Sequence, residues 1–144
     1  MSRETEEMNI SLTKEQIGFL IEETKKKYPI EACGLLFGEM NGKKAVVTKI
    51  VTFQNVLKSS TNFQINMEEF LKTLLKAEED GMQLIGFFHS HPAAPQPSST
   101  DIEYMRLWPG NIWLIISSID YDIAAYQVSD AVIKKVNIEV ENAQ

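Results

Sequence analysis

Cysteine, histidine and long apolar runs are scarce in this sequence. Its one cysteine, Cys33, excludes an intramolecular disulfide and any zinc module built from four cysteines. No stretch approaches the ~18 consecutive apolar residues of a membrane-spanning helix. The chain also opens without a charged and then apolar leader, so we expect a cytoplasmic protein with no membrane partner.

Positive charge is in short supply as well. The chain has 14 lysines and arginines against 20 aspartates and glutamates, which gives a formal net charge of -6. Because nucleic-acid affinity rests mainly on clustered basic side chains, we expect no nucleic-acid partner. The 144 residues, of which 44% are hydrophobic, are enough to bury one core, and we expect a single domain over residues 1–144.

Two helices are predicted from capping residues and apolar spacing. Thr13 and Gln16 have capping-box spacing, and the helix that they begin should end before Pro29. Asn66 caps a second helix, which Gly81 closes. The residues expected on the apolar faces are Ile17, Leu20, Ile21 and Tyr28 in the first helix and Phe70, Leu71, Leu74 and Leu75 in the second.

Several segments have the β-branched and aromatic composition of strands. The predicted strands are residues 34–38, 45–53, 84–89, 111–119, 123–128 and 131–140. The first two are joined at Asn41 and Gly42, a pair typical of a tight hairpin, and a short helix is expected over 98–107. Because strands and helices mix without strict alternation, we expect an α/β fold of the α+β kind, in which helices flank a small mixed sheet.

The two histidines of the chain are its most informative residues. His89 and His91 end an apolar segment, and residues i and i+2 of a strand project to the same face. Asp101 follows after a proline-rich loop. Two imidazoles and one carboxylate form a ligand set suited to Zn²⁺, and three protein ligands leave a fourth position for water, as in catalytic zinc sites. The sequence therefore indicates a hydrolytic metal site.

Each of these residues also has an ordinary structural interpretation. A single histidine is more often a satisfied core or surface residue, although two at strand spacing favour a metal site. Asp101 stands three residues after Ser98, so the two also match a helix cap, a role compatible with metal binding. Glu31 lies in an otherwise apolar segment. It is either a general base beside the metal or a satisfied charge at a helix–strand junction.

These residues resemble the motifs of the JAMM (MPN+, Mov34-type) zinc metalloprotease family. The resemblance is carried by three segments, which span most of the expected core. They are Glu31-Ala32-Cys33-Gly34-Leu35-Leu36-Phe37-Gly38, His89-Ser90-His91-Pro92 and Pro97-Ser98-Ser99-Thr100-Asp101. The chain looks like a minimal, prokaryotic-type member of this family.

The resemblance implies a fold, a cofactor and a role for each residue. The fold would be the cytidine-deaminase-like JAMM domain, and one Zn²⁺ would be held by His89, His91 and Asp101. Glu31 would act as general base and then as general acid, while Ser98 would stabilise the oxyanion.

The resemblance also implies a substrate class. A relative of this type would cleave the bond after the C-terminal tail of a ubiquitin-like or sulfur-carrier protein, either an isopeptide bond to lysine or an α-amide. In larger relatives, insertions beside the motifs bind the substrate, and residues 54–65 are the counterpart expected in this chain. The loop 92–97 is one residue shorter than is usual in the family. We expect this difference to affect the substrate groove rather than the zinc ligands.

Three other functions compete with the peptidase. A non-catalytic MPN scaffold would typically lose the metal ligands, and this chain retains them. A RadC-like protein linked to DNA repair shares the histidine and serine–aspartate motifs, but the acidic charge suits DNA poorly. A zinc nucleobase deaminase needs a Cys-x-x-Cys pair and is excluded. We expect Cys33 itself to be a buried apolar residue with no chemical role.

Overall fold

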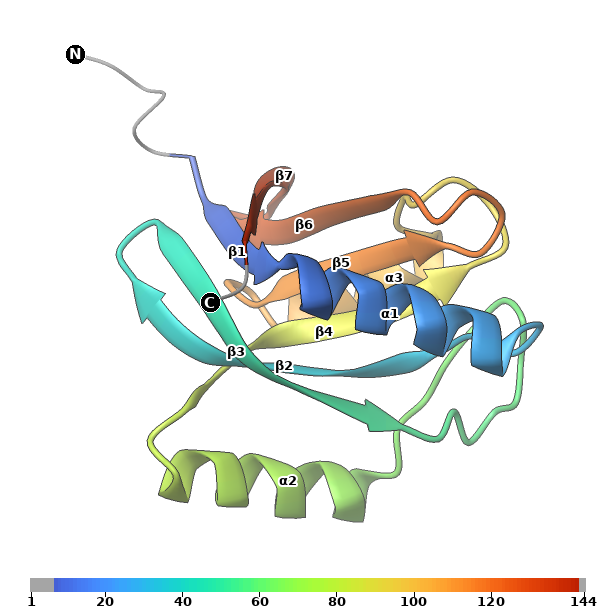
Figure 1. The fold of residues 1–144 in the computed structure, drawn as a ribbon, viewed down its shortest axis with the longest axis horizontal. Coiled ribbons are helices and arrows are strands. Elements are labelled where there is room, and N and C mark those ends of the chain that lie inside the picture. Colours follow the sequence, from blue (N-terminus) through green and yellow to red (C-terminus); the bar gives the residue numbers. More distant parts are fainter. Residues whose placement is uncertain (1–6, 143–144) are drawn as a thin grey trace.

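A computed structural model describes residues 7–142, while residues 1–6 and 143–144 of the expected domain lie outside the described part (Figure 1). Along the chain the elements are β1 Asn9–Thr13, α1 Lys14–Lys27, β2 Cys33–Asn41, β3 Lys44–Phe53, α2 Met67–Glu79, β4 Gln83–His91, α3 Ser99–Leu107, β5 Ile112–Ser117, β6 Ile123–Ser129 and β7 Val132–Glu141. This combination of helices and a mixed sheet confirms the expected fold class.

The strands form one mixed sheet that closes on itself. Their order is β1-β3-β2-β4-β5-β6-β7, and β1 pairs in parallel with both β3 and β7. The sequence analysis missed β1, because its five residues directly precede the helix cap and are too few to show a periodic pattern. Since β1 is the partner that β3 and β7 would otherwise lack, the closed sheet has no free edge within residues 7–142.

Each face of the sheet has its own apolar core. On one face, Leu20 of α1 belongs to a cluster with Phe88 of β4. On the other, Phe70 of α2 and Met105 of α3 share a cluster with Trp113 of β5. In Figure 1, α1 lies in front of the sheet and α3 behind it. Alternate side chains of a strand point to opposite faces, so β4 and β5 contribute to both cores.

The starts of the helices follow the predicted capping. Thr13 Oγ1 accepts a hydrogen bond from the Gln16 N–H at 3.1 Å, and Gln16 Oε1 accepts one from the Thr13 N–H at 2.9 Å. Asn66 caps α2 by accepting from the Glu69 N–H at 3.0 Å. None of the helices in residues 7–142 has the length and apolar character needed to cross a membrane.

The two predicted apolar faces are only partly buried. Tyr28 lies past the end of α1 and is 63% exposed, while Glu23 is buried in the helix instead. In α2, Phe70 is buried but Leu71 and Leu75 are 48% and 61% exposed. The cause is the position of α2, which packs on the sheet mainly through β4, so the outer half of the expected stripe faces solvent.

Gly86 permits an unusually close approach of β4 and β5. A Cβ atom at this position would lie 1.7 Å from the backbone oxygen of Ile112. No side chain fits there unless the two strands separate. The parallel pairing of β4 with β5 extends from Gly86 to His91, so this contact helps to fix the end of β4 that carries the histidines.

Candidate metal centre

Both histidines lie inside β4, which extends two residues beyond its predicted end. The neighbouring residues Phe88 and Ser90 point to the opposite face, so the two imidazoles share the face that α3 covers. His89 is fully buried, and His91 is 8% exposed. The strand therefore holds both rings in fixed directions.

Three potential ligand atoms form a nearly equilateral triangle. The Nε2 atoms of His89 and His91 are 3.1 Å apart, and Asp101 Oδ2 lies 3.1 Å from each of them. Ligand atoms bound ~2.0–2.1 Å from a tetrahedral metal ion are about 3.3–3.4 Å from one another. The triangle therefore matches one face of such a tetrahedron and leaves the fourth corner to a ligand from outside the protein.

The first turn of α3 fixes Asp101. Ser98 Oγ accepts a hydrogen bond from the Asp101 N–H at 3.1 Å, and Asp101 Oδ2 accepts one from the Ser98 N–H at 2.9 Å. The reciprocal cap expected from the spacing is thus present, and the capping oxygen is the one that faces the histidines. The Ser98 hydroxyl still has its own proton to donate, because it only accepts in this cap.

Glu31 reaches the site from the segment between α1 and β2. Its Oε2 atom lies 3.9 Å from His91 Nε2, and Glu31, His89 and His91 offer three ligand atoms within 4.8 Å of one another. Glu31 is only 3% exposed, and neither carboxylate oxygen has a hydrogen-bond partner among residues 7–142. Burial, and then the charge of Asp101, raise the pKa of Glu31 from 4.5 to about 8. Such a carboxyl group can accept and return a proton near neutral pH.

Asp101 and His89 are held in the forms that bind metals. Burial by itself raises the pKa of Asp101, but hydrogen bonds with His89 and His91 outweigh it and hold that pKa well below its usual range. Burial lowers the pKa of His89, and the hydrogen bond with Asp101 only partly opposes this shift. An ionised carboxylate and a neutral imidazole are the states that coordinate a metal ion.

These residues fit a divalent metal ion. The triangle has the required spacing, and two imidazole nitrogens with one carboxylate oxygen are a donor set typical of zinc-like ions. The buried carboxylate oxygens of Glu31 also have no hydrogen-bond partner among the described residues, and a neighbouring metal ion would compensate their burial. The structure thus brings together all the residues that the sequence singled out, namely Glu31, His89, His91, Ser98 and Asp101.

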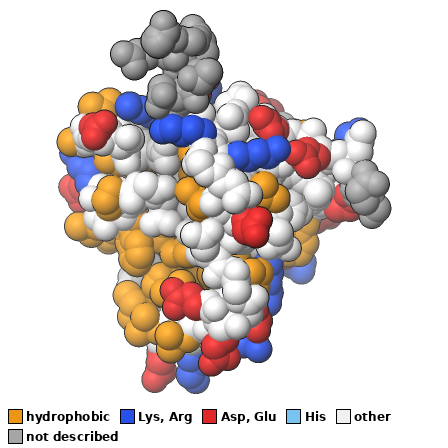
Figure 2. All heavy atoms as spheres, turned by 90° about the vertical axis from the view of Figure 1, so that its left-hand side faces the viewer, with side chains coloured by type: hydrophobic (Ala, Val, Ile, Leu, Met, Phe, Trp, Pro, Cys, Tyr) orange, Lys and Arg blue, Asp and Glu red, His pale blue; other side chains and the backbone are white. Residues whose placement is uncertain are grey.

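An apolar groove lies beside the His89 ring. Phe63 stacks on this ring with centroids 4.7 Å apart, and Trp113 meets it edge-on at 6.0 Å. Both aromatic residues line a groove of about 370 Å³, together with Gln64, Ile65, Met67, Phe70, Phe87, Tyr104, Leu107 and Trp108. Figure 2 shows hydrophobic side chains gathered in the lower part of the molecule, at the height of α2 in Figure 1. Phe63 was not predicted as a site residue, because it lies in a loop without periodicity.

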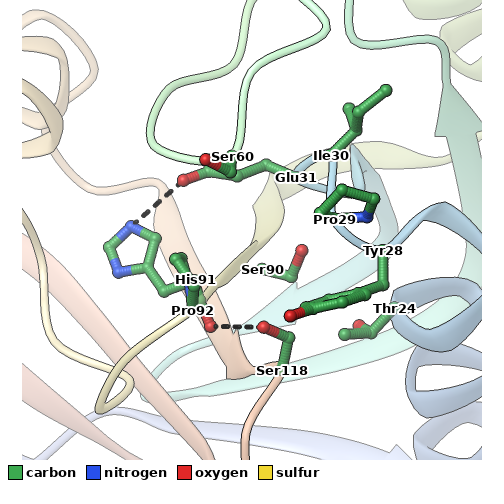
Figure 3. Close-up of a pocket in the computed structure, with 10 residues that line it drawn as sticks. All are labelled: Thr24, Tyr28, Pro29, Ile30, Glu31, Ser60, Ser90, His91, Pro92 and Ser118. Atoms are coloured by element: carbon green, nitrogen blue, oxygen red, sulfur yellow. Dashed lines mark hydrogen bonds and ion pairs between the residues drawn. The ribbon is translucent and has the colours of Figure 1, made fainter.

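A narrow, more polar cleft lies beside Glu31 (Figure 3). It shares no lining residue with the apolar groove, and Tyr28, Ser60 and Ser118 surround it together with Glu31 and His91. The backbone oxygen of His91 accepts from the Ser118 N–H at 2.7 Å and from its hydroxyl at 3.1 Å. The site is therefore bordered by an apolar environment at His89 and a polar one at Glu31.

Cys33 takes no part in this site. It is a free thiol, 1% exposed, that follows Glu31 by two residues. Burial, and then the charge of Glu31, raise the pKa of the thiol to about 12. Because the thiolate is the reactive form of cysteine, this environment agrees with a purely apolar role.

Comparisons with known proteins place the chain among prokaryotic JAB-domain proteins. A family model described as prokaryotic homologs of the JAB domain matches residues 14–129. A desampylase from Pyrococcus furiosus is 43% identical over 89 residues, which cover 61% of this chain and 60% of that protein. A desampylase from Haloferax volcanii is 32% identical over 115 residues, which cover 78% of this chain and 80% of that protein. The match thus spans less than two thirds of the Pyrococcus protein.

The solved structures agree as well. The solution structure of protein DSY2949 from Desulfitobacterium hafniense is similar to this chain with a TM-score of 0.80 and 28% sequence identity. The similarity covers 93% of this chain and 94% of that one, so it extends over nearly the whole of both chains.

Proposed function

Because the chain belongs to the family of prokaryotic JAB-domain proteins, we propose that it is a zinc-dependent isopeptidase that removes a ubiquitin-like or sulfur-carrier protein from its conjugates. The observation that carries this proposal is the triangle of His89, His91 and Asp101 beside the unpaired, buried carboxylate of Glu31. This arrangement suits hydrolysis rather than metal storage, since one coordination position and one base remain free.

Each residue has a role that its position supports. His89, His91 and Asp101 would hold Zn²⁺, which when bound lowers the pKa of a water molecule and polarises the carbonyl group of the scissile bond. Glu31 accepts a proton at its carboxylate and later returns it to the leaving amine. Ser98 donates its hydroxyl proton to the developing oxyanion, a contact often worth about 3 kcal/mol.

Two observations support the substrate class. The relatives from Pyrococcus and Haloferax are both named desampylase, a name for the removal of a ubiquitin-like modifier. The apolar groove adjoins His89 through Phe63 and Trp113 and can bury the apolar side chains of an extended tail. The polar cleft at Glu31 then lies where the leaving amine would receive its proton.

The competing functions explain less of the structure. In a non-catalytic scaffold the buried carboxylate of Glu31 would cost several kcal/mol, roughly, without any use. A RadC-like partnership with DNA would require basic clusters, whereas the chain has a net charge of -6. Neither alternative accounts for a free coordination position next to a base.

Cleavage of a defined conjugate tests the proposal. The probe is a ubiquitin-like protein joined through its C-terminal carboxyl group to the lysine of a fluorescein-labelled peptide, and release is followed by fluorescence polarisation. We expect turnover by the zinc-loaded wild type, none after chelation, and recovery when Zn²⁺ is returned. Glu31→Gln should lose nearly all turnover but bind Zn²⁺ with unchanged stoichiometry. Normal cleavage by this variant would show that the assigned base is wrong.

The role of Ser98 is separated from folding by a matched pair of cap variants. Ser98→Ala should lower kcat by about 10²–10³-fold through loss of the oxyanion donor. It should also destabilise the fold by about 1 kcal/mol through loss of the α3 cap. Thr13→Ala removes the equivalent cap of α1 and should lower stability alone. An equal loss of kcat in both variants would contradict the oxyanion role.

A further inference from the structure

The carboxylate of Glu31 is not held in place by any hydrogen bond of its own. Both of its oxygens are buried and have no hydrogen-bond partner in the described part of the chain, where the nearest ionisable nitrogen, His91 Nε2, is 3.9 Å away. Asp101, by contrast, is fixed by the Ser98 N–H and by both histidines. The direction of the Glu31 side chain must therefore be set by its backbone and by packing.

The peptide group between Glu31 and Ala32 is held by hydrogen bonds at both its N–H and its carbonyl oxygen. The Ala32 N–H donates a hydrogen bond to Ser90 Oγ at 2.8 Å, and the Glu31 carbonyl oxygen of the same peptide accepts one from Asn55 Nδ2 at 3.3 Å. The Glu31 N–H also donates to the carbonyl oxygen of Ser59 at 2.8 Å. All of the backbone hydrogen-bonding groups next to the Glu31 side chain are therefore occupied.

Ser90 links this peptide to the metal ligands. It stands between His89 and His91 in β4, and its side chain points to the face opposite to theirs. The Ser90 N–H also donates to the Ala32 carbonyl oxygen at 3.0 Å. The residue that separates the two histidines thus fixes their strand against the residue that follows Glu31.

Asn55 organises the loop on the other side. Its side chain is 5% exposed and donates to the carbonyl oxygens of Ser59 and Asn62 as well as to that of Glu31. Its Oδ1 atom accepts from the backbone N–H groups of Leu57 and Gln64. One amide side chain therefore shapes the loop that meets Glu31 and that also carries Phe63 onto the His89 ring.

We propose that Asn55 and Ser90 are positioning residues for the reaction, because they clamp the Glu31–Ala32 peptide and thereby aim the Glu31 carboxylate at the metal centre. We call these two contacts the peptide clamp. The inference rests on the proposed function only in that Glu31 is taken as the base. A displacement of about 1 Å at a reacting group can lower a rate by 10²-fold, so a base without hydrogen bonds of its own depends strongly on such a clamp.

Two single substitutions open the clamp with little change in size. Asn55→Asp keeps the acceptor for the Leu57 and Gln64 N–H groups but loses the donor to the Glu31 carbonyl oxygen. Ser90→Ala removes the acceptor for the Ala32 N–H. With the fluorescein-labelled conjugate as probe, we expect each variant to lower kcat by about 10- to 100-fold. The affinity for Zn²⁺ should stay within about threefold of wild type in both variants, since the metal ligands are intact. In Ser90→Ala, KM should also stay within about threefold, since Ser90 does not line the apolar groove.

A matched control excludes a general loss of stability. Asn111 also donates from Nδ2 to backbone oxygens, those of Leu84 and Ile85, at the end of β4 remote from the histidines. Asn111→Asp makes the same chemical change as Asn55→Asp and should leave kcat unchanged. If Asn111→Asp lowers kcat as much as the clamp variants do, the clamp has no special role and the proposal is wrong.

A double-mutant cycle tests whether the clamp acts through Glu31. In a Glu31→Gln background, Asn55→Asp and Ser90→Ala should cause no further loss of the residual activity, because there is no base left to aim. Additive losses would overturn the proposal. Hydrogen exchange of the Ala32 amide proton, measured by NMR, is independent of activity, and Ser90→Ala should accelerate it by at least tenfold. If Ser90→Ala leaves the exchange rate of the Ala32 amide unchanged, the clamp is refuted. If Ser90→Ala accelerates this exchange but the wild type does not cleave the conjugate, only the proposed function is refuted.

Discussion

Replacing the proposed base by glutamine should stabilise the metal-free protein at alkaline pH. The Glu31 carboxyl group has a pKa of about 8 in the folded protein, against 4.5 for an unperturbed glutamate. A shift of this size corresponds to about 5 kcal/mol, at about 1.4 kcal/mol per pH unit. Because water that enters the site would reduce the cost of burial, this figure is an upper bound, and a gain of at least about 2 kcal/mol is the expected result.

The sign follows from the number of protons that each state binds. Below pH 4.5 the carboxyl group is protonated in both states and contributes no difference. Between pH 4.5 and about 8 the unfolded chain releases this proton while the folded protein keeps it, so stability falls as pH rises. Above about 8 the destabilisation is complete. Glu31→Gln has no proton to lose, so its advantage over the wild type should grow through this range.

Urea unfolding of the two chelated proteins between pH 4.5 and 9 measures the effect. Asp101 and His89 titrate in both proteins, so most of their contribution cancels in the difference at each pH. Saturation with Zn²⁺ should shrink the difference, because a neighbouring cation favours the carboxylate. The reasoning would be refuted if the difference in stability between the two chelated proteins were the same at every pH. It would also be refuted if Glu31→Gln were less stable than the wild type at pH 9.

Three further substitutions test other parts of the structure. Gly86→Ala places a Cβ atom 1.7 Å from the Ile112 backbone oxygen and should lower the free energy of unfolding in urea by at least about 2 kcal/mol. Asp101→Asn removes the anionic ligand, and the affinity for Zn²⁺, measured by competition with a chromogenic chelator, should fall more than about 100-fold. Tyr126→Phe removes the 3.1 Å hydrogen bond to the Pro95 carbonyl oxygen and should cost about 1 kcal/mol of stability without loss of bound zinc. These expectations would be contradicted by an unchanged stability of Gly86→Ala, by an unchanged affinity of Asp101→Asn for Zn²⁺, or by a loss of zinc from Tyr126→Phe.

The grouping of residues at the candidate metal centre was predictable because these residues come in pairs that are close in sequence. Strand geometry alone directs His89 and His91 to one face, and helix-cap geometry alone ties Asp101 to Ser98. Each pair needs only local structure, and a loop of six residues joins them. Glu31 was found differently, as a charge in an apolar segment. Its approach to His91 depends on the pairing of β2 with β4, which the residues do not reveal by periodicity.

The features that were missed depend on partners far away in the sequence. The strand β1 exists because β3 and β7 flank it, and no pattern in its own five residues shows this. Leu71 and Leu75 have helical spacing that suits burial, yet the sheet offers α2 only a limited contact. Asn55 has no distinctive neighbours in the loop 54–65, and its importance arises from hydrogen bonds that only the folded chain brings together.

The peptide clamp explains how the Glu31 carboxylate can stay buried without hydrogen bonds of its own. A carboxylate with no hydrogen bonds would normally rotate toward water, and the free energy that opposes its burial favours such a movement. Three backbone contacts resist it by fixing the Glu31–Ala32 peptide between Ser90 and the loop of Asn55. Activity and stability therefore oppose each other at this residue. A carboxylate that reaches water is no longer desolvated. Opening the clamp should therefore lower kcat and also reduce the loss of stability that the metal-free protein shows as pH rises.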